Sequence, residues 1–562
     1  MSDMKNAPLI PTPPGFPVEW DEPGDARLFW VHDLTHYSDQ LTPYDFFTVK
    51  DIFETVADKV NQAYHVPLKT FCRHFNTYFY SASVPQLGPI EEMIAQNKLC
   101  WEKLNAAMGN LWNRWENDWL PEVRQHLAYW EACDLKGASA TKLSEYLNET
   151  DQRVRRTWEI HLLLSYPMVI AISLFEEMYR DLFGNAKPFE AYQLLVGFEN
   201  KTVESAKALW KLSRQALASP KVCKVLTDYA PSEVIPKLSD FEEGRAFVKE
   251  IDSYLQMYGK RSNNEVLKNS FWAEAPSPVI KNLQNYITQP ERDLTDELKK
   301  QAENRELRVA EVREQMQGYP KPVSSQFDFL LKAAQEGNRL REEHTHWIDF
   351  SVSYHQRQVV LVLTCGIRLA EAGVIDSKDD VFYLKPDEVR ESMAALPKIT
   401  DRRSVVKDRR EKENRFSAQP APPVLGTPPA GPPPDDPILR AFFKVLGVPP
   451  TPSNIPGELK GSPGSAGTVR GKAKVVRSLA DAGKLNSGDI LVAEYTVASW
   501  TPLFASIAAV VTDSGGVLSH SSVVAREYGI PAVVGTGMAT VVIKDGQTIE
   551  VNGDTGIVRV IE

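Results

Sequence analysis

One histidine lies beside a glycine turn at the start of a predicted helix. Residues 508–511 form a short apolar run that is typical of a buried strand, and Gly515 and Gly516 follow it. Two glycines let the backbone turn sharply and leave room for another group to come close. Ser519 is a favourable N-cap residue, and the apolar spacing after it is helical. The sequence therefore predicts that His520 lies at a helix N-terminus, next to a loop without side chains.

This position favours phosphoryl chemistry. The first backbone N–H groups of a helix have no intrahelical acceptor and carry partial positive charge. They disfavour an imidazolium ion, so the neutral and nucleophilic ring predominates, and they bind anions such as a phosphoryl group. A neutral imidazole at an anion site can accept a phosphoryl group and pass it on. The alternative is that His520 only caps its helix.

The residues around His520 also match a known pattern. The matching positions are Thr512, Gly515, Gly516, Ser519, His520, Ala525, Arg526, Gly529, Ile530 and Pro531. Together with residues 461–473 and 496–504, they resemble the swivelling phosphohistidine domain of phosphoenolpyruvate synthase, pyruvate phosphate dikinase and rifampin phosphotransferase. The resemblance implies an α/β (β/β/α) carrier domain whose phosphoryl group is carried by His520. It also implies that the groups that hold the phosphoryl oxygens are Thr512, Gly515, Gly516, Ser519 and Ser521.

The composition of the chain is that of an ordinary globular protein. Of its 562 residues, 43% are hydrophobic and 25% are charged, and the net charge of −10 argues against a general nucleic-acid binder. The longest apolar run, residues 162–175, is interrupted by Ser165 and Pro167, which favours a buried helix over a membrane span. The five cysteines show no paired or metal-binding spacing, and the N-terminus has no apolar signal core. We therefore expect a cytoplasmic protein with reduced thiols, no metal on this chain and no membrane partner.

Residues 26–415 are predicted to form a large, mainly α-helical domain that binds the phosphoryl acceptor. A stripe of apolar residues at spacings of three and four supports this prediction: Trp101, Leu104, Met108, Leu111, Trp115 and Trp119. The stripe is interpreted as helix-bundle core. The alternative is an aromatic wall for an apolar ligand, in which case Trp101 would bind substrate.

Three histidines of this region are candidates for acid–base or binding roles. His32 and His36 lie four residues apart, next to Trp30, and on a helix they would share a face. The two histidines could bind a metal ion, but the sequence shows no clear third ligand. The alternative is that this segment is a loop whose aromatic residues pack on the core. His36 and His161 are each a candidate base for a substrate hydroxyl, whereas Trp30 and His32 are candidate substrate contacts. The alternative for His161 is a core histidine.

Other stretches of the helical part resemble the central region of the synthase-like and rifampin-type enzymes. They are residues 258–262 with Glu265, 272–276, 341–357 and 379–384. The resemblance implies an acceptor-binding domain in which Lys260 and Glu265 contact the substrate. It departs from the family at Lys260, where a histidine is usual. Arg261 is a candidate cation for the phosphoryl oxygens.

The predicted domains are a proline-rich arm (1–25), the helical domain (26–415), a proline-rich linker (416–454) and the carrier domain (455–562). Proline-rich chain rises about 3.1 Å per residue, so the linker's proline-rich segment, residues 419–434, could reach roughly 50 Å, as a carrier that visits two sites requires. The alternative is a strap that lies on the surface. Within the linker, residues 438–446 are predicted to form a short amphipathic helix.

The sequence shows no P-loop, and it leaves no room for the nucleotide-grasp domain or the pyruvate-binding barrel of the dikinases. We therefore expect a separate ATP-grasp subunit, which binds ATP and Mg²⁺ and phosphorylates His520. This layout resembles phenylphosphate synthase, which implies a small aromatic (phenolic) hydroxyl as acceptor. The alternatives are a split rifampin-type antibiotic phosphotransferase and a non-catalytic phosphocarrier or docking protein.

Overall fold

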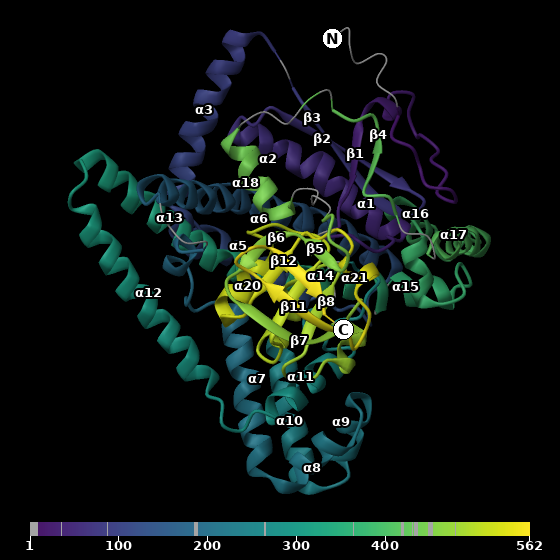
Figure 1. Ribbon diagram of the computed structural model, residues 1–562. Helices are drawn as coiled ribbons and strands as arrows, with labels where there is room; N and C mark the ends of the chain where they lie inside the picture. Colours follow the sequence, from purple (N-terminus) through teal and green to yellow (C-terminus); the bar gives the residue numbers. More distant parts are fainter. Residues whose placement is uncertain are drawn as a thin grey trace. The chain divides into compact units, whose positions relative to one another are not determined.

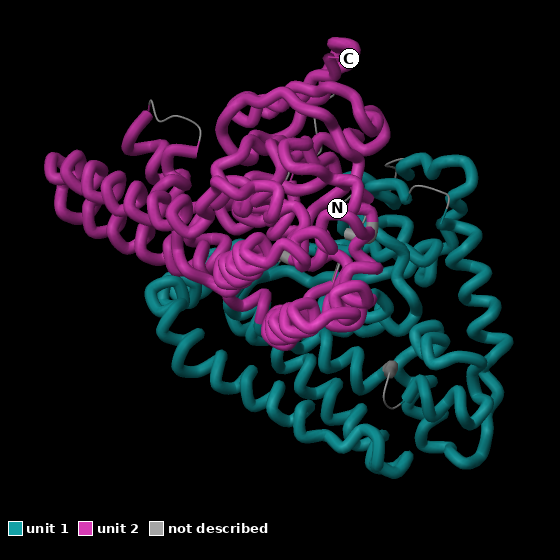
Figure 2. The backbone as a smooth tube through the Cα atoms, turned by 90° about the horizontal axis from the view of Figure 1, so that it is seen from below, with its two compact units in different colours: residues 1–166, 265–269, 347–434 teal, residues 167–264, 270–346, 435–562 magenta. Residues whose placement is uncertain are grey.

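The structure is a computed structural model that describes residues 9–34, 36–86, 88–184, 189–262, 266–362, 365–417, 421–429, 431, 436–447, 453–477 and 479–561. The chain forms two compact units, which Figure 2 distinguishes by colour. Unit 1 contains residues 1–166, 265–269 and 347–434, and unit 2 contains residues 167–264, 270–346 and 435–562. The units cut across the predicted helical domain, because residues 167–264 and 270–346 group with the carrier residues. The predicted domain boundaries remain predictions.

Unit 1 is built mainly from helices. They are α1 (Pro43–Asp51), η3 (Ile52–Val56), α2 (Ala57–Tyr64), α3 (Ile90–Met108), α4 (Leu111–Arg114), η4 (Trp115–Trp119), α5 (Leu120–Glu131), the first part of α6 (Ala140–Leu182), α14 (Ser353–Arg357), η7 (Gln358–Val362), α15 (Cys365–Glu371), η8 (Lys378–Tyr383), α16 (Pro386–Ala395) and α17 (Arg403–Phe416). η2 (Asp25–Arg27) precedes them. η6 (His346–Val352) starts at His346, which belongs to unit 2, and continues in unit 1. The tryptophan stripe is core, as predicted, since Leu104, Trp115 and Trp119 are buried.

Unit 1 also contains a sheet, which the prediction of a mainly α-helical domain did not include. The strands are β1 (Phe29–His32), β2 (Leu68–Phe75), β3 (Tyr78–Pro85) and β4 (Val424–Gly426), in the order β2-β3-β1-β4. Asn76 and Thr77 join β2 to β3 with φ of 50° and 72°. Two turn residues with positive φ match the right-handed twist of a hairpin, which explains why this aromatic and β-branched stretch pairs with itself.

Part of the proline-rich linker is fixed in this sheet. β4 pairs antiparallel with β1, and Leu425 is fully buried. The hydroxyl of Tyr80 donates a hydrogen bond of 2.6 Å to the carbonyl of Pro422. The described residues 421–426 therefore lie as a strap on unit 1, which was the alternative to a free tether.

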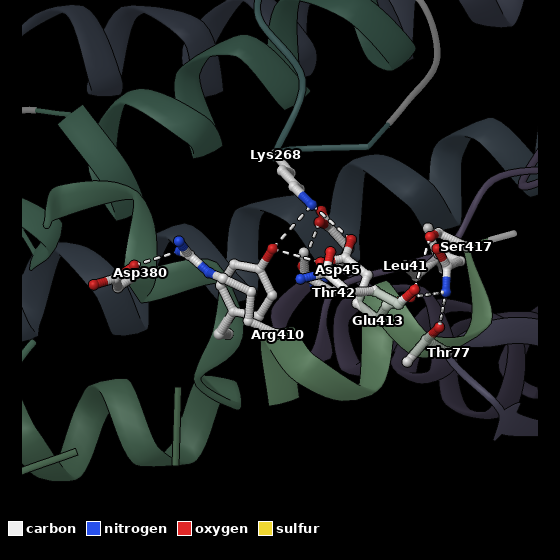
Figure 3. Close-up of polar contacts among 12 residues, drawn as sticks. Leu41, Thr42, Asp45, Thr77, Lys268, Asp380, Arg410, Glu413 and Ser417 are labelled. Carbon is white, nitrogen blue, oxygen red and sulfur yellow. Dashed lines mark hydrogen bonds and ion pairs between the residues drawn. The ribbon is translucent and has the colours of Figure 1, made fainter. Parts of the chain in front are cut away.

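A polar network fastens α17 to the rest of unit 1 (Figure 3). The ammonium of Lys268 lies 2.6 Å from the carboxylate of Glu413 and 3.1 Å from the hydroxyl of Tyr383. Arg410 of α17 forms an ion pair of 2.5 Å with Asp380. The side chain of Asp45 accepts the backbone N–H of Leu267 at 2.7 Å. These contacts hold the short segment 266–269 in unit 1.

The first part of unit 2 is a set of helices. They are the end of α6, η5 (Ala191–Leu194), α7 (Lys201–Ala218), α8 (Pro220–Asp228), α9 (Pro231–Ser239), α10 (Glu242–Tyr258), α11 (Ser277–Ile287), α12 (Leu294–Met316), α13 (Lys321–Thr345) and α18 (Pro437–Leu446). α7 to α11 share one apolar core that includes Trp210, Leu283 and Tyr286 (Figure 1). α18 confirms the predicted short helix at residues 438–446.

The carrier residues of unit 2 form a mixed sheet with the strand order β5-β12-β11-β7-β8-β9-β10-β6. The strands are β5 (Glu458–Lys460), β6 (Ser462–Ser465), β7 (Thr468–Val475), β8 (Ile490–Ala493), β9 (Ala509–Thr512), β10 (Ala532–Val534), β11 (Thr548–Asn552) and β12 (Ile557–Val560). The helices are η9 (Leu479–Lys484), η10 (Ala498–Trp500), α19 (Thr501–Phe504), α20 (His520–Tyr528) and α21 (Ala539–Val542). The large helical part and the α/β carrier domain confirm the predicted fold class.

α6 is long and apolar enough to be a candidate membrane span by length and composition. Its most apolar window is 67% buried inside the protein. A buried apolar helix satisfies the same test, and the apolar stretch at residues 162–175 was predicted to be one.

Candidate functional site

His520 is the first residue of α20, as the sequence predicts. Ser519 is the N-cap residue with extended backbone, and Gly529 ends the helix in the left-handed conformation with φ of 65°. β9 precedes the glycine turn, and Val523 and Val524 face the core. The local signals for strand, turn, helix and stop therefore agree with the structure.

The imidazole of His520 is mostly buried, and each ring nitrogen faces a polar group. Nδ1 lies 3.4 Å from Oε1 of Glu342, and Nε2 lies 3.4 Å from the hydroxyl oxygen of Thr501. The ring of Phe504 meets the imidazole edge to face at 6.2 Å. Glu342 comes from α13 of the helical part of unit 2, so the carrier histidine is docked against that part in this structure.

The Glu342 carboxylate is ionised although it is buried. Burial alone would raise the pKa of this carboxyl, but His520, Arg341 and the hydroxyl of Thr202 hold it at about 2. The Thr202 hydroxyl donates to Oε2 of Glu342 at 2.9 Å. Arg341 also donates to the carbonyl of Leu518 in the loop before His520. Arg341 and Glu342 therefore link α13 to the segment that contains Leu518 and His520.

The glycine turn is packed against protein backbone, which uses the room that two glycines leave for a close approach. Gly515 has φ of 97°, in the left-handed region that glycine tolerates best. The N–H of Gly516 donates to the carbonyl of Val445, at the C-terminal end of α18, at 3.0 Å. A Cβ on Gly516 would lie 2.4 Å from the carbonyl oxygen of Lys444. The turn needs glycine because α18 packs on it, and the Gly516 N–H is not free for a phosphoryl group in this arrangement.

Three hydroxyls that were predicted to bind the phosphoryl group are instead used inside the carrier domain. Thr512 donates to the carbonyl of Ser514, and Ser521 shares a hydrogen bond of 2.8 Å with Thr496. Ser519 donates to the hydroxyl of Ser522 and does not cap the helix with its side chain. All three side chains are buried. In this structure they shape the loop that carries His520.

Cationic groups gather near Glu342 in the helical part of unit 2. Arg261 is buried, and its pKa is lowered by burial, while Glu342 and nearby tyrosines act against that effect. The pKa of His346 is held well below its usual range, first by burial and then by Arg261, Lys201 and Lys260. Arg261 and Lys260 therefore belong to the same neighbourhood as the residue that contacts His520. Glu265, the other residue of this predicted set, lies outside the described residues.

A second carboxylate joins the carrier to the helical part of unit 2. Glu527 of α20 is buried, and it accepts the backbone N–H of Gly197 at 2.9 Å and the amide of Asn338 at 3.3 Å. Burial raises the pKa of Glu527 to about 7, and Glu342 adds to that rise. Its neighbour Arg526 holds the loop by donating to the carbonyls of Gly464 and Val517.

The predicted contacts near residue 32 belong to unit 1. His32 ends the strand β1, so it does not share a helix face with His36. Trp30 is fully buried and donates to the carbonyl of Asp25, so it is a core residue of unit 1. Burial lowers the pKa of His32 to about 4, and its ring stacks on Tyr80. Nδ1 of His36 lies 2.9 Å from the Asp33 carboxylate, and the His36 side chain is partly exposed.

His161 lies beside a buried carboxylate. Its Nδ1 lies 3.0 Å from Asp349, and its ring packs on Trp158 at 4.8 Å. Trp101 lies half-buried on α3 at the end of the apolar stripe. These residues belong to unit 1.

Unit 1 also has a cavity of about 150 Å³, whose lining includes Lys385, Arg409, Lys412 and Glu413. Arg409 is already paired with Glu388 at 2.6 and 2.9 Å. Glu413 is held by the network of Figure 3. The predicted substrate and base residues do not line this cavity.

The geometry of unit 2 supports group transfer at an imidazole. A buried ring lies at a helix N-terminus with a carboxylate at one nitrogen and a hydroxyl at the other. Sequence reasoning did not single out Glu342, Thr202, Thr501 or Glu527. The only signal was that residues 341–357 and 496–504 resembled known enzymes, which pointed to stretches without choosing residues.

Comparison with known proteins gives two family matches. Residues 485–556 match the PEP-utilising enzyme mobile domain, and residues 162–342 match the fourth domain of rifampicin phosphotransferase. His520 lies in the first match, and Glu342 is the last residue of the second. The contact between His520 and Glu342 therefore joins the two matched regions.

Three curated relatives illustrate the similarity. Chondramide synthase of Chondromyces crocatus is 41% identical over 99% of this chain and 14% of its own length. An uncharacterized phosphotransferase of Bacillus subtilis is 30% identical over 72% of this chain and 47% of its own length. A rifampicin phosphotransferase of Streptomyces sviceus is 31% identical over 64% of this chain and 40% of its own length. The chain thus spans less than half the length of each of these relatives.

Proposed function

Since the chain carries a PEP-utilising enzyme mobile domain and a rifampicin phosphotransferase fourth domain, we propose that it is the carrier and acceptor-binding part of a phosphotransferase. The observation that carries this proposal is the position of His520. It lies at the N-terminus of α20 and is docked against a helix of the other matched region.

The loading step transfers a phosphoryl group from ATP to His520. A lone pair of the imidazole attacks the β-phosphorus, and the bond from that phosphorus to the oxygen of AMP breaks. The γ-phosphoryl group goes to water and leaves as phosphate. A separate ATP-grasp subunit supplies ATP and Mg²⁺ and catalyses this step.

The transfer step takes place with the carrier at the acceptor site. A substrate hydroxyl attacks the phosphorus in line, the P–N bond breaks, and the ring nitrogen recovers its electron pair. The hydroxyl proton goes to a base, for which His36 and His161 are the candidates. Catalysis consists mostly of positioning and charge neutralisation. Arg261 and Lys260 are the candidate cations on this part of the chain.

We propose a small phenol as the acceptor. A phenol has a pKa of about 10, so its hydroxyl needs less activation than that of an alcohol. The aromatic residues first assigned to substrate are core (Trp30) or half-buried on α3 (Trp101), so they do not define an acceptor pocket. The second candidate is a rifampin-type acceptor, which is favoured by the match of residues 162–342.

The test uses the full chain, an ATP-grasp partner and [β-³²P]ATP. Phosphorylation of phenol or catechol, with no transfer to rifampicin, supports the phenolic acceptor, whereas the reverse supports the rifampin-type acceptor. Label that remains on the protein with every hydroxyl tested points to the docking-protein alternative. His520→Ala is the control, since its label should vanish from both the protein and the product.

A further inference from the structure

We propose that Glu342 is a positioning residue for His520, and that α13 supplies it to the carrier only in the docked arrangement. This inference rests on the proposed function and adds a residue to it. Among the described residues, Glu342 is the carboxylate that forms an ion pair with His520, at 3.4 Å from Nδ1. The residue lies 178 positions away in the sequence and on a different element.

The carboxylate is held so that only one of its oxygens faces the histidine. Oε2 accepts the hydroxyl of Thr202 at 2.9 Å, and Oε1 faces Nδ1 of His520. The Glu342 side chain is only 5% exposed, so water cannot readily replace the imidazole as its partner. A buried carboxylate needs such partners, because an unpaired buried charge is costly.

Two mostly buried carboxylates of the carrier, Glu527 and Asp513, have other partners. Glu527 is bound by Gly197 and Asn338, and Asp513 is bound by the hydroxyls of Thr536 and Thr540. Neither has a recorded contact with His520. The groups at the imidazole are therefore Glu342 at Nδ1 and the Thr501 hydroxyl at Nε2.

A carboxylate accepts hydrogen bonds and cannot donate one, so Glu342 favours the ring form that carries its proton on Nδ1. The lone pair of Nε2 then faces Thr501 and is the one available for phosphorus. In the transfer step the same proton matters again. When the P–N bond at Nε2 breaks, a ring that keeps its Nδ1 proton leaves as neutral imidazole, whereas a ring without it must leave as an imidazolide anion. Glu342 thus helps the docked carrier to give up its phosphoryl group.

The test compares Glu342→Gln with the wild type. The glutamine amide has nearly the same shape but can donate to Nδ1, which favours the opposite ring form, with the proton on Nε2. We expect the transfer rate to fall by ~10²-fold, at the low end of the range for an acid–base group, with little change in acceptor KM. The pH above which transfer declines should also move downward, because the Nδ1 proton is held less firmly.

A direct readout does not need any phosphoryl group. Long-range ¹H–¹⁵N NMR of the unphosphorylated full chain, with His520 assigned from His520→Ala, reports which ring nitrogen carries the proton. The wild type should show the Nδ1–H form, and Glu342→Gln should show a shift toward Nε2–H. Glu343→Gln is the matched control, since Glu343 is the next residue on α13 and accepts the backbone N–H of Lys201. It should leave the tautomer unchanged.

Thr202→Val removes a hydrogen bond from Glu342 without touching His520, and it should give a smaller rate loss of the same kind. It serves as the test if Glu342→Gln does not fold. An unchanged tautomer together with a transfer rate within twofold of wild type, in either variant, would overturn the inference. Failure of the proposed function looks different, because the wild-type His520 would then take up no phosphoryl group at all.

Discussion

Docking of the carrier should weaken as the pH rises, because Glu527 must stay protonated to remain buried. Burial raises the pKa of Glu527 from 4.5 to about 7 in the docked arrangement. The groups that face it are Glu342, which adds to the rise, and Gly197, Asn338 and Arg526, which oppose it. Tyr528, the next residue on α20, is also buried beside it. In an undocked carrier these partners are lost, and an exposed glutamate returns to its ordinary pKa.

The size and sign of the effect follow from proton linkage. The docked state binds the proton more tightly, so the contribution of Glu527 to docking is complete below about pH 4.5 and is lost as the pH rises through 7. The difference of about two and a half pH units corresponds to about 3 kcal/mol at 1.36 kcal/mol per unit. The docking equilibrium at pH 8 should therefore be weaker by up to ~300-fold than at pH 4.5.

The assay is hydrogen–deuterium exchange of the peptide that contains Gly197, whose N–H donates to Glu527. Wild type and Glu527→Gln are compared at each pH, so that the intrinsic pH dependence of exchange cancels. The glutamine keeps an acceptor oxygen but has no charge to bury. We expect similar protection at pH 5 and greater protection in the variant at pH 8. Glu303→Gln, at an exposed position of α12, is the control. Identical protection in wild type and Glu527→Gln across pH 5–8 would refute this reasoning.

Three further predictions concern the carrier and its connection. His520→Ala should abolish transfer and leave the melting temperature of the chain within a few degrees of wild type; retained turnover in a radiolabel assay would exclude His520 as carrier. Gly516→Ala should lower the free energy of unfolding by about 1–3 kcal/mol, since its Cβ would meet the Lys444 carbonyl at 2.4 Å. Gly483→Ala is the control, because Gly483 has open space around it and the substitution should leave the free energy of unfolding unchanged. Equal denaturation midpoints for the two variants would contradict the packing argument. Deletions within residues 427–435 should slow transfer in single-turnover assays without changing acceptor affinity, and an unchanged rate would argue that the carrier does not swing.

The local structure around His520 was predictable because its signals lie within twenty residues of one another. An apolar strand, two glycines, an N-cap serine and a glycine–proline stop each restrict the backbone on their own. The hairpin β2–β3 was not predicted, because its local signals are weak. Its alternating pattern is short, and it lies within a region whose neighbours have helical spacing. Its turn residues, Asn76 and Thr77, are a weaker hairpin signal than Asn-Gly.

The partners of His520 could not be predicted, because they meet it only in three dimensions. Glu342 lies in a densely charged helix where any of several carboxylates could face inward. The group that comes close to Gly515 and Gly516 is the end of α18, and no sequence pattern links these two segments. The linker was predicted from its composition, which does not reveal that residues 424–426 pair with β1.

The central claim is that His520 carries a phosphoryl group, and the most direct test is intact-mass analysis under alkaline conditions. The full chain would be incubated with its ATP-grasp partner, ATP and Mg²⁺, then mapped by peptide sequencing and treated with acid. The account predicts one added phosphoryl group that maps to His520 and is lost in acid, and no addition in His520→Ala. An unmodified mass in the presence of an active ATP-grasp partner, or an acid-stable phosphoryl group on another residue, would contradict it.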